Sequence, residues 1–298
     1  MSTHGTSADL LAQFAVSPKR RRKDRIARAT ILAATLIALV PLALIIYYLL
    51  SKGLSSWSWS FFTTDPTGNT FFKNSSIGGI QSAILGTIEM VALASLISIP
   101  IGIGVAIWLV EYGRASWFAQ VVRFFVDVLT GVPSIIFGLF VYIALIIGTG
   151  STYAAYKGSI ALSLLMLPIV IRSAEVILLL VPHALRESAL ALGAPRWRVI
   201  FSIVLPTALP GMVTGMLLAV ARAAGETAPL LFTAAYTMKT NFNLSQFMNS
   251  LPVQIYNDVT SPTAAVVERA WGAALTLVVM ILILNLIARL ISRRSRLA

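Results

Sequence analysis

Two pairs of oppositely charged residues lie deep within apolar segments of this sequence. Arg222 and Glu226 are four residues apart, and Arg172 and Glu175 are three apart, so on a helix each pair shares one face. A charged side chain at bilayer depth costs roughly 2.5–3.5 kcal/mol on insertion scales, so both pairs are expected to face protein or water. Because a guanidinium group presents a fixed fork of donors, the two arginines predict a transient oxyanion site.

The depth of the two arginines follows from the prolines that bound their segments. Arg222 lies 12 residues after Pro210, about 18 Å along a helix, and Arg172 lies 10 residues before Pro182, about 15 Å. Both distances start from the same side of the membrane. The arginines are therefore expected at similar depth, on consecutive segments that the connection 182–198 makes neighbours.

The two glutamates have a predicted role beside this site. Glu175 and Glu226 are expected to offset the positive charge while no anion is bound, so that binding stays weak enough for release. A further hypothesis is that they accept the hydrogen of HPO₄²⁻, which sulfate lacks. The alternative is that both pairs are salt bridges that only fix helix packing. Glu89 and Asp127, also in apolar segments, are interpreted as structural, with Asp127 near enough to the cytoplasmic surface to be solvated.

Composition places these residues in a membrane protein. The 298 residues are 57% hydrophobic and 11% charged, whereas a soluble domain is about 25% charged. The net charge of +12 does not indicate nucleic-acid binding, because the basic residues flank apolar runs. The absence of Cys excludes disulfides and thiolate chemistry, and with His4 and His183 as the two histidines no metal site is predicted.

Six apolar segments are long enough to cross a hydrocarbon core of roughly 30 Å as helices. The first is too long for a secretory signal and lacks a small-residue cleavage site, so it is predicted to remain on the chain. Pro100 is expected to bend the second segment, and Gly131-Val-Pro133-Ser134 to break the third. The predicted segments are residues 29–50, 77–110, 121–147, 159–181, 206–232 and 271–291.

Charge predicts the orientation of these segments. About sixteen of the 23 lysines and arginines fall on one side of the predicted helices and about five on the other, which places both termini in the cytoplasm. The predicted fold class is an all-α integral membrane protein with about six transmembrane helices. Its parts are a cytoplasmic basic tail (1–28), a first membrane helix (29–50), an extracytoplasmic loop (51–76), a core (77–292) that includes a cytoplasmic loop (182–198) and a second outside loop (236–268), and a cytoplasmic tail (293–298).

The cytoplasmic loop predicts a short helix. Leu185, Ala189 and Leu192 follow helical spacing, and Gly193 is a natural helix stop with Pro195 beyond it. An amphipathic helix displayed on this side either lies on the membrane surface or docks into a groove of a partner, and periodicity favours neither.

The spacing of this loop resembles a known motif. Glu187-Ser188-Ala189 is followed after three residues by Gly193, and after nine more by Ile203-Val-Leu-Pro206. The pattern resembles the EAA loop in permease subunits of ABC importers, with Ser188 in place of the first Ala. The resemblance implies a type I ABC importer permease fold and a coupling helix that fits a cleft on an ATPase subunit. The residues implied in that coupling are Arg186, Glu187, Ser188, Ala189 and Gly193.

Further segments narrow the resemblance to one subfamily. Trp108-Leu-Val-Glu-Tyr112, Gly131-Val-Pro-Ser-Ile-Ile-Phe-Gly138 and Arg222-Ala-Ala-Gly-Glu-Thr227 together resemble the phosphate-specific importer, and 228–234 resembles its A-type (PstA-type) permease. The resemblance covers about residues 75–292. The residues implied to lie on the substrate pathway are Arg172, Arg222, Glu226, Glu175 and Thr227.

The same resemblance implies an assembly in a bacterial or archaeal cell membrane. A second, C-type permease would complete the pathway, two ATPase subunits would bind ATP, and an extracytoplasmic phosphate-binding protein would deliver the ion. The chain itself is expected to need no cofactor and to be no enzyme, because it has no G-x-x-x-x-G-K-[ST] sequence for ATP.

Other functions remain as alternatives. The chain is otherwise an ABC permease for another oxyanion, such as molybdate or sulfate, or a secondary anion transporter that acts alone. Dependence of transport on ATP separates the last of these from the first two. A membrane enzyme is the weakest alternative, because no Ser/His/Asp, Cys/His or H-E-x-x-H arrangement appears.

Overall fold

The computed structural model describes residues 18–67, 77–113 and 116–294. Parts of the predicted terminal tails, of the loop 51–76 and of the turn at Arg114 lie outside these described residues. By their contacts, the residues up to Ser51 form one unit and those from Lys52 onward form a second.

The described ranges are helical almost throughout, and they contain no strand beyond an isolated antiparallel bridge between Pro66 and Gly78. The elements are α2 (Pro18–Gly53), η1 (Leu54–Ser56), α3 (Trp59–Thr63), α4 (Gln81–Ile107), η2 (Trp108–Tyr112), α5 (Trp117–Gly131), α6 (Ser134–Val141), η3 (Tyr142–Ile147), α7 (Ala155–Leu180), α8 (His183–Ala191), α9 (Arg196–Val199), η4 (Ile200–Val204), α10 (Leu205–Ala224), α11 (Ala228–Thr233), α12 (Leu251–Val259) and α13 (Ala264–Arg294). η1 is a 3₁₀ turn, and η2, η3 and η4 are π-helical turns.

The first unit is the long apolar helix α2. It begins at Pro18 rather than near residue 29, so the basic run forms the first turns of the helix instead of an irregular tail. Lysine and arginine are good helix formers, and a proline at the first helical position lacks an N–H that would in any case have no partner. The side chains of its apolar stretch are exposed, as lipid contact requires.

The number of membrane-length helices agrees with the sequence. Among the described residues, five helices are long and apolar enough to span a membrane, and α5 with α6 makes a sixth if this bent pair counts as one span. The two halves of the pair meet at 104° around Val132 and Pro133. Pro133 has no N–H to donate and disfavours helical angles at the residue before it, so the predicted break is confirmed. Pro100 lies inside the continuous helix α4.

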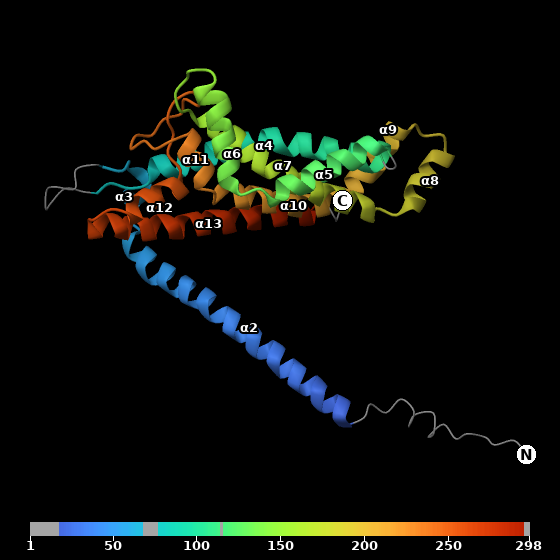
Figure 1. Ribbon diagram of the computed structural model, residues 1–298, viewed down its shortest axis with the longest axis horizontal. Helices are drawn as coiled ribbons and strands as arrows, with labels where there is room; N and C mark the ends of the chain where they lie inside the picture. The colour runs from blue at the N-terminus through green and yellow to red at the C-terminus, as the bar shows by residue number, and fades with distance from the viewer. Residues whose placement is uncertain (1–17, 68–76, 114–115, 295–298) are drawn as a thin grey trace, which may run out of the picture. The chain divides into compact units, whose positions relative to one another are not determined.

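Helix α7 lies at the centre of the second unit. It packs against α4 and α10, and α13 packs against α10, so that these helices lie side by side in Figure 1. Their contact is filled by small and flexible apolar side chains, among them Met90, Met166, Ala219 and Ala223, all of which are buried. In water, burial of apolar groups contributes roughly 0.8 kcal/mol per CH₂. Between helices in lipid this contribution is largely absent, and close packing is the main stabilising term.

Two glycines fix the register of α10 against α7. A Cβ added at Gly215 would lie 2.2 Å from Cβ of Ser173, and one added at Gly211 would lie 2.8 Å from Cγ2 of Ile177. Moving four residues forward on α10 therefore corresponds to moving four residues back on α7. The helices run antiparallel, with backbones close enough that only glycine fits at these two positions.

The fifth predicted segment ends earlier than expected. The sequence predicts it to run to about Phe232, but α10 ends at Ala224 and the separate short helix α11 follows. Pro229 explains the break, because a continuing helix would need an N–H at Pro229 to bond the carbonyl of Gly225. The chain is instead capped at Gly225, whose N–H donates to the carbonyl of Arg222 over 3.1 Å.

The predicted outside loop 236–268 contains a helix and a buried polar network. The side chain of Ser250 caps α12 by accepting from the Val253 N–H. Arg269 of α13 holds both oxygens of Asp258 of α12, at 2.8 and 2.7 Å, and both side chains are under 8% exposed. Burial raises the pKa of the hydroxyl of the neighbouring Tyr236. The segment is thus a folded cap on this end of the bundle.

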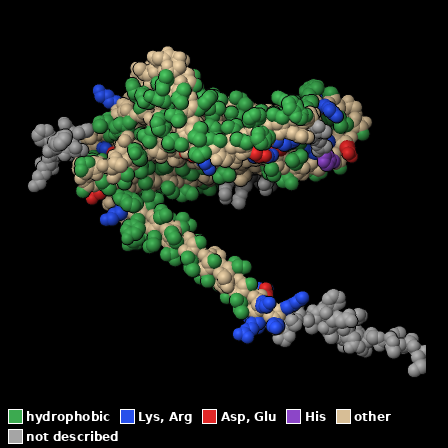
Figure 2. Space-filling view, in the orientation of Figure 1, with side chains coloured by type: hydrophobic (Ala, Val, Ile, Leu, Met, Phe, Trp, Pro, Cys, Tyr) green, Lys and Arg blue, Asp and Glu red, His purple; other side chains and the backbone are tan. Residues whose placement is uncertain are grey.

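The opposite end of the bundle carries α8, α9 and the turn that joins them (Figure 1). Helix α8 ends at Ala191, and Gly193 adopts a left-handed φ of +82°, as the sequence predicts for a helix stop. Between the two ends, hydrophobic side chains cover most of the face shown in Figure 2.

Candidate functional site

The predicted pair of Arg172 and Glu175 lies on α7 and forms direct contacts. Nη1 of Arg172 donates to Oε2 of Glu175 over 2.9 Å, and the glutamate side chain is 4% exposed. The carboxylate has a second cationic partner, because Nε of Arg123 on α5 donates to Oε1 over 2.6 Å. The two arginines together compensate the cost of burying the negative charge of Glu175.

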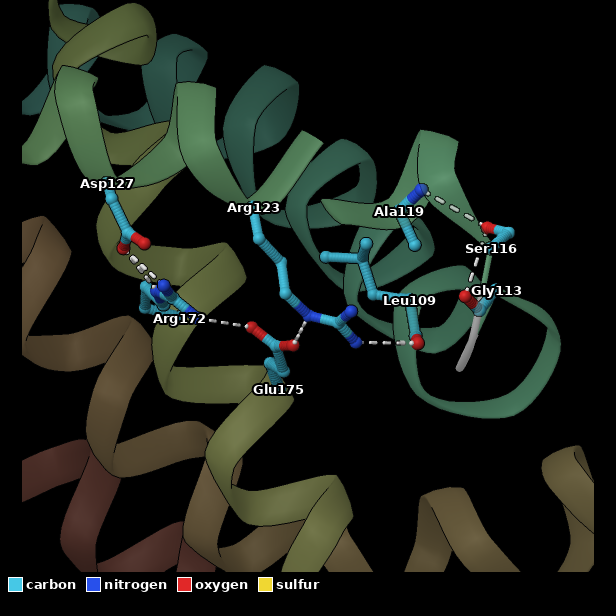
Figure 3. A network of polar contacts seen from close by, with 8 residues as sticks. All are labelled: Leu109, Gly113, Ser116, Ala119, Arg123, Asp127, Arg172 and Glu175. Atoms are coloured by element: carbon cyan, nitrogen blue, oxygen red, sulfur yellow. Dashed lines mark hydrogen bonds and ion pairs between the residues drawn. The ribbon is translucent and has the colours of Figure 1, made fainter. Parts of the chain in front are cut away.

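Helix α5 supplies the other half of this site. Arg172 donates through both Nε and Nη2 to Oδ1 of Asp127, with the Nε contact at 2.8 Å. Arg123 donates through Nη2 to the carbonyl of Leu109 over 3.0 Å. Figure 3 shows the four charged side chains in one row, and we call Arg123, Asp127, Arg172 and Glu175 the α5–α7 cluster.

Sequence reasoning missed much of this cluster. From sequence, Arg123 is only one of the basic residues that predict orientation, and Asp127 is interpreted as structural. In the structure Arg123 pairs with Glu175, and Asp127 pairs with Arg172. The available signal was the spacing of Arg123 and Asp127, which are four residues apart on one face of α5. Their partners on α7 are about fifty residues away in sequence, so no local pattern identifies them.

The pair of Arg222 and Glu226 is looser. Nε of Arg222 lies 3.5 Å from Oε1 of Glu226, and their side chains are 54% and 15% exposed. The prediction that both share one helix face is wrong, because α10 ends between them and Glu226 lies in the connection to α11. Arg222 stands in the last turn of α10, where the negative end of the helix dipole favours a cation. Thr227 is the residue that precedes α11.

The expected equal depth of the two arginines is also wrong. Because Gly215 faces Ser173 and Gly211 faces Ile177, the same register places Arg222 opposite residue 166 rather than Arg172. Six residues of helix separate those levels, about 9 Å. The estimate failed because it counted from Pro210, whereas the span begins at Arg196. The arginines thus form two levels along α7 and α10.

The predicted coupling residues separate into buried and exposed groups. Arg186 is 7% exposed and donates to Glu111 Oε1 (3.0 Å) and to the carbonyls of Val181 and Leu178 (2.6 and 2.8 Å). It therefore attaches α8 to η2 and to the end of α7. Ala189 is buried as well, whereas the other predicted coupling residues are exposed, namely Glu187, Ser188 and Gly193.

A groove of about 420 Å³ lies beside α8. Glu111 and Arg186 form its polar wall, and Leu190 and Val199 contribute apolar side chains. Within the described ranges no three His, Asp or Glu side chains gather as a metal ion would require. Glu89 is half-buried on α4.

The bundle, the bent α5–α6 pair and the displayed α8 define a membrane permease of the kind found in ABC importers. Residues 98–297 match the family of the binding-protein-dependent transport system inner membrane component, and the chain belongs to this family. Solved structures agree on the fold. A MetNI methionine ABC transporter has a TM-score of 0.60 at 20% identity, covering 71% of this chain and 93% of that chain. A bacterial alginate ABC transporter has a TM-score of 0.61 at 17% identity, covering 93% and 96%.

Closer relatives are found among curated sequences. The chain is 41% identical over 279 residues to the phosphate transport system permease protein PstA of Yersinia pestis, covering 93% of this chain and 92% of the relative. It is 39% identical over 284 residues to PstA 1 of Mycobacterium tuberculosis H37Rv, covering 94% and 92%. These relatives share nearly the full length of the chain.

Proposed function

We propose that this chain is the A-type permease subunit of an ATP-driven phosphate importer. The observation that carries the proposal is the full-length similarity, at about 40% identity, to proteins named phosphate transport permeases. The two levels of arginine on α7 and α10 support it, because guanidinium forks suit a tetrahedral oxyanion. In this proposal Arg172 and Arg222 contact phosphate in succession, with Thr227 beside the second level.

The proposed partners follow from the number of membrane-length segments and from the exposed residues of α8. Six membrane-length segments make half of a pathway, so a second, C-type permease would complete it. Two ATPase subunits would receive α8 through exposed residues such as Glu187 and Ser188, and an extracytoplasmic phosphate-binding protein would load the other end. ATP would be bound and hydrolysed in the ATPase subunits, and both termini would lie in the cytoplasm.

The second candidate is transport of another oxyanion. The fold does not set the substrate, because the structural neighbours include a methionine transporter and an alginate transporter. Arg172 and Arg222 would also bind sulfate or molybdate, which are oxyanions as well. The name shared by the curated relatives favours phosphate.

Transport by the reconstituted complex tests the proposal. Uptake of radiolabelled phosphate into proteoliposomes is measured with excess sulfate or molybdate as competitor and with or without ATP. We expect phosphate uptake that depends on ATP and that phosphate analogues inhibit, whereas excess sulfate or molybdate does not. Uptake of sulfate or molybdate in preference to phosphate would overturn the substrate, and uptake without ATP would overturn the importer class.

Two substitutions test the residues. Arg222→Lys keeps the charge but loses the planar fork, and we expect transport to fall about tenfold, as loss of a charge-assisted hydrogen bond would produce. Glu226→Gln tests the hypothesis that a carboxylate recognises the hydrogen of HPO₄²⁻. If phosphate uptake and the preference over sulfate are unchanged in Glu226→Gln, that hypothesis is wrong.

A further inference from the structure

Each guanidinium nitrogen of Arg172 donates a hydrogen bond in this structure, which engages three of its five N–H donors. Nη1 donates to Glu175, and the edge formed by Nε and Nη2 donates to Asp127. An oxyanion that binds arginine in the bidentate manner uses such an edge of two parallel donors. Phosphate therefore cannot take the Nε–Nη2 edge of Arg172 while Asp127 holds it.

The two carboxylates that hold Arg172 differ in burial and support. The side chain of Glu175 is 4% exposed and is also held by Arg123, so its displacement would leave a second arginine without its partner. The side chain of Asp127 is 56% exposed, and Arg172 contacts it through a single oxygen, Oδ1. Exposed ion pairs are worth about 0–1 kcal/mol in water, so the contact of Arg172 with Asp127 is the weaker of the two.

The position of Asp127 in α5 allows such a displacement. It lies one turn before Gly131 and the break at Pro133, where α5 and α6 bend through 104°. The other half of α5 is held to α7 and η2 through Arg123, which contacts both Glu175 and the carbonyl of Leu109. A small tilt of α5 about Arg123 would therefore move Asp127 away from Arg172 and leave the Arg123–Glu175 contact in place.

We propose that Asp127 is a positioning residue that occupies the anion-binding edge of Arg172 in the empty state and yields it to substrate phosphate. This inference rests on the proposed function. Asp127 holds the Arg172 fork in one orientation. It also lowers the affinity of Arg172 for phosphate by competing for the same donors. When phosphate leaves, the carboxylate returns to the edge and closes the site against rebinding.

The test compares phosphate binding and transport in the assembled complex. Asp127→Asn removes the charge but keeps the size of the side chain. We expect the Kd for radiolabelled phosphate, measured on the detergent-solubilised complex without binding protein, to fall about tenfold, the change expected when a charged competitor for two donors is removed. ATP-driven transport by the same variant is expected to slow, because release becomes harder.

Two further variants complete the design. Asp24→Asn is the matched control, because Asp24 pairs with Arg28 on α2 at 2.9 Å and its side chain is 58% exposed, close to the 56% of Asp127. It should leave binding and transport unchanged. Asp127→Glu restores the carboxylate and should return the Kd toward that of the wild type.

The outcome separates a competitor from a merely structural residue. If Asp127 only stabilises the fold, Asp127→Asn binds phosphate more weakly and unfolds at lower temperature, and the inference is overturned. An unchanged Kd also overturns it. These results differ from failure of the proposed function, which would be seen as absence of phosphate uptake by the wild-type complex itself.

Discussion

The α5–α7 cluster and the Arg222–Glu226 pair use the same residue types in different surroundings. In the cluster, two arginines and two carboxylates hold each other across two helices, and Glu175 is almost completely buried. At the second level, Arg222 and Glu226 lie 3.5 Å apart at a helix end, and the arginine is 54% exposed. The comparison indicates that the first level is held in place by its carboxylates, whereas the second is less constrained.

The difference follows from where each pair stands in the fold. Glu175 lies within α7, the most buried of the membrane-length helices, and its side chain is 4% exposed against 37% for Arg172, so the buried carboxylate must be compensated on more than one side. Arg222 lies in the last turn of α10, where the helix dipole already favours a positive charge and the chain then turns at Gly225. One carboxylate at moderate distance is sufficient there.

Removing the buried carboxylate should have the largest effect. Glu175→Gln leaves Arg123 and Arg172 without the negative charge between them, and we expect a loss of about 3–5 kcal/mol in stability, as found when one partner of a buried ion pair is removed. Thermal unfolding of the solubilised complex measures it. A transition at the temperature of the wild type would contradict the view that the cluster is held by this carboxylate.

A substitution at the close contact between α10 and α7 should have an intermediate effect on stability. In Gly215→Ala the new Cβ would lie 2.2 Å from Ser173, so α10 must move away from α7, at a cost of about 1–3 kcal/mol. Gly225→Ala is the matched control, because its nearest neighbour is the Arg222 carbonyl at 3.7 Å and its φ is negative, at −93°. The control should stay within about 0.5 kcal/mol. Equal effects of the two alanines would show that the register is not set at Gly215.

The smallest effect is expected at the second level. Glu226→Gln should change stability by about 0–1 kcal/mol, because the contact with Arg222 is long, at 3.5 Å, and the arginine is 54% exposed. The same thermal transition measures it, now at low and high salt, since screening should remove the difference between wild type and variant. A loss as large as that of Glu175→Gln would remove the distinction between the two levels.

Local patterns were sufficient for much of the fold. Apolar length predicted the membrane segments, and single residues with strong backbone preferences, Pro133 and Gly193, marked the break and the helix stop correctly. The early end of α10 had the same kind of signal in Pro229, which apolar composition around it concealed. These features depend on a few consecutive residues, which is why a sequence reveals them.

The packing of one helix against another could not be predicted from a few consecutive residues. The register of α10 on α7 depends on which small residues meet, and a count from Pro210 cannot supply it. The contact of Asp127 with Arg172 joins residues on different helices, and the sequence shows only that each lies in an apolar segment. The candidate site was thus predicted by residue type and corrected by tertiary packing.

The composition of α5 has an electrical consequence. Across Trp117–Gly131 its charged residues are one arginine and one aspartate, Arg123 and Asp127, so the helix carries no net charge. A displacement of α5 as a whole therefore does almost no work against the membrane potential, whereas a single elementary charge that crosses the membrane exchanges about 2.3 kcal/mol per 100 mV. The tilt about Arg123 moves Asp127 without its neutralising arginine, so this motion, unlike a displacement of the whole helix, should respond to membrane voltage in proportion to the depth that the carboxylate crosses.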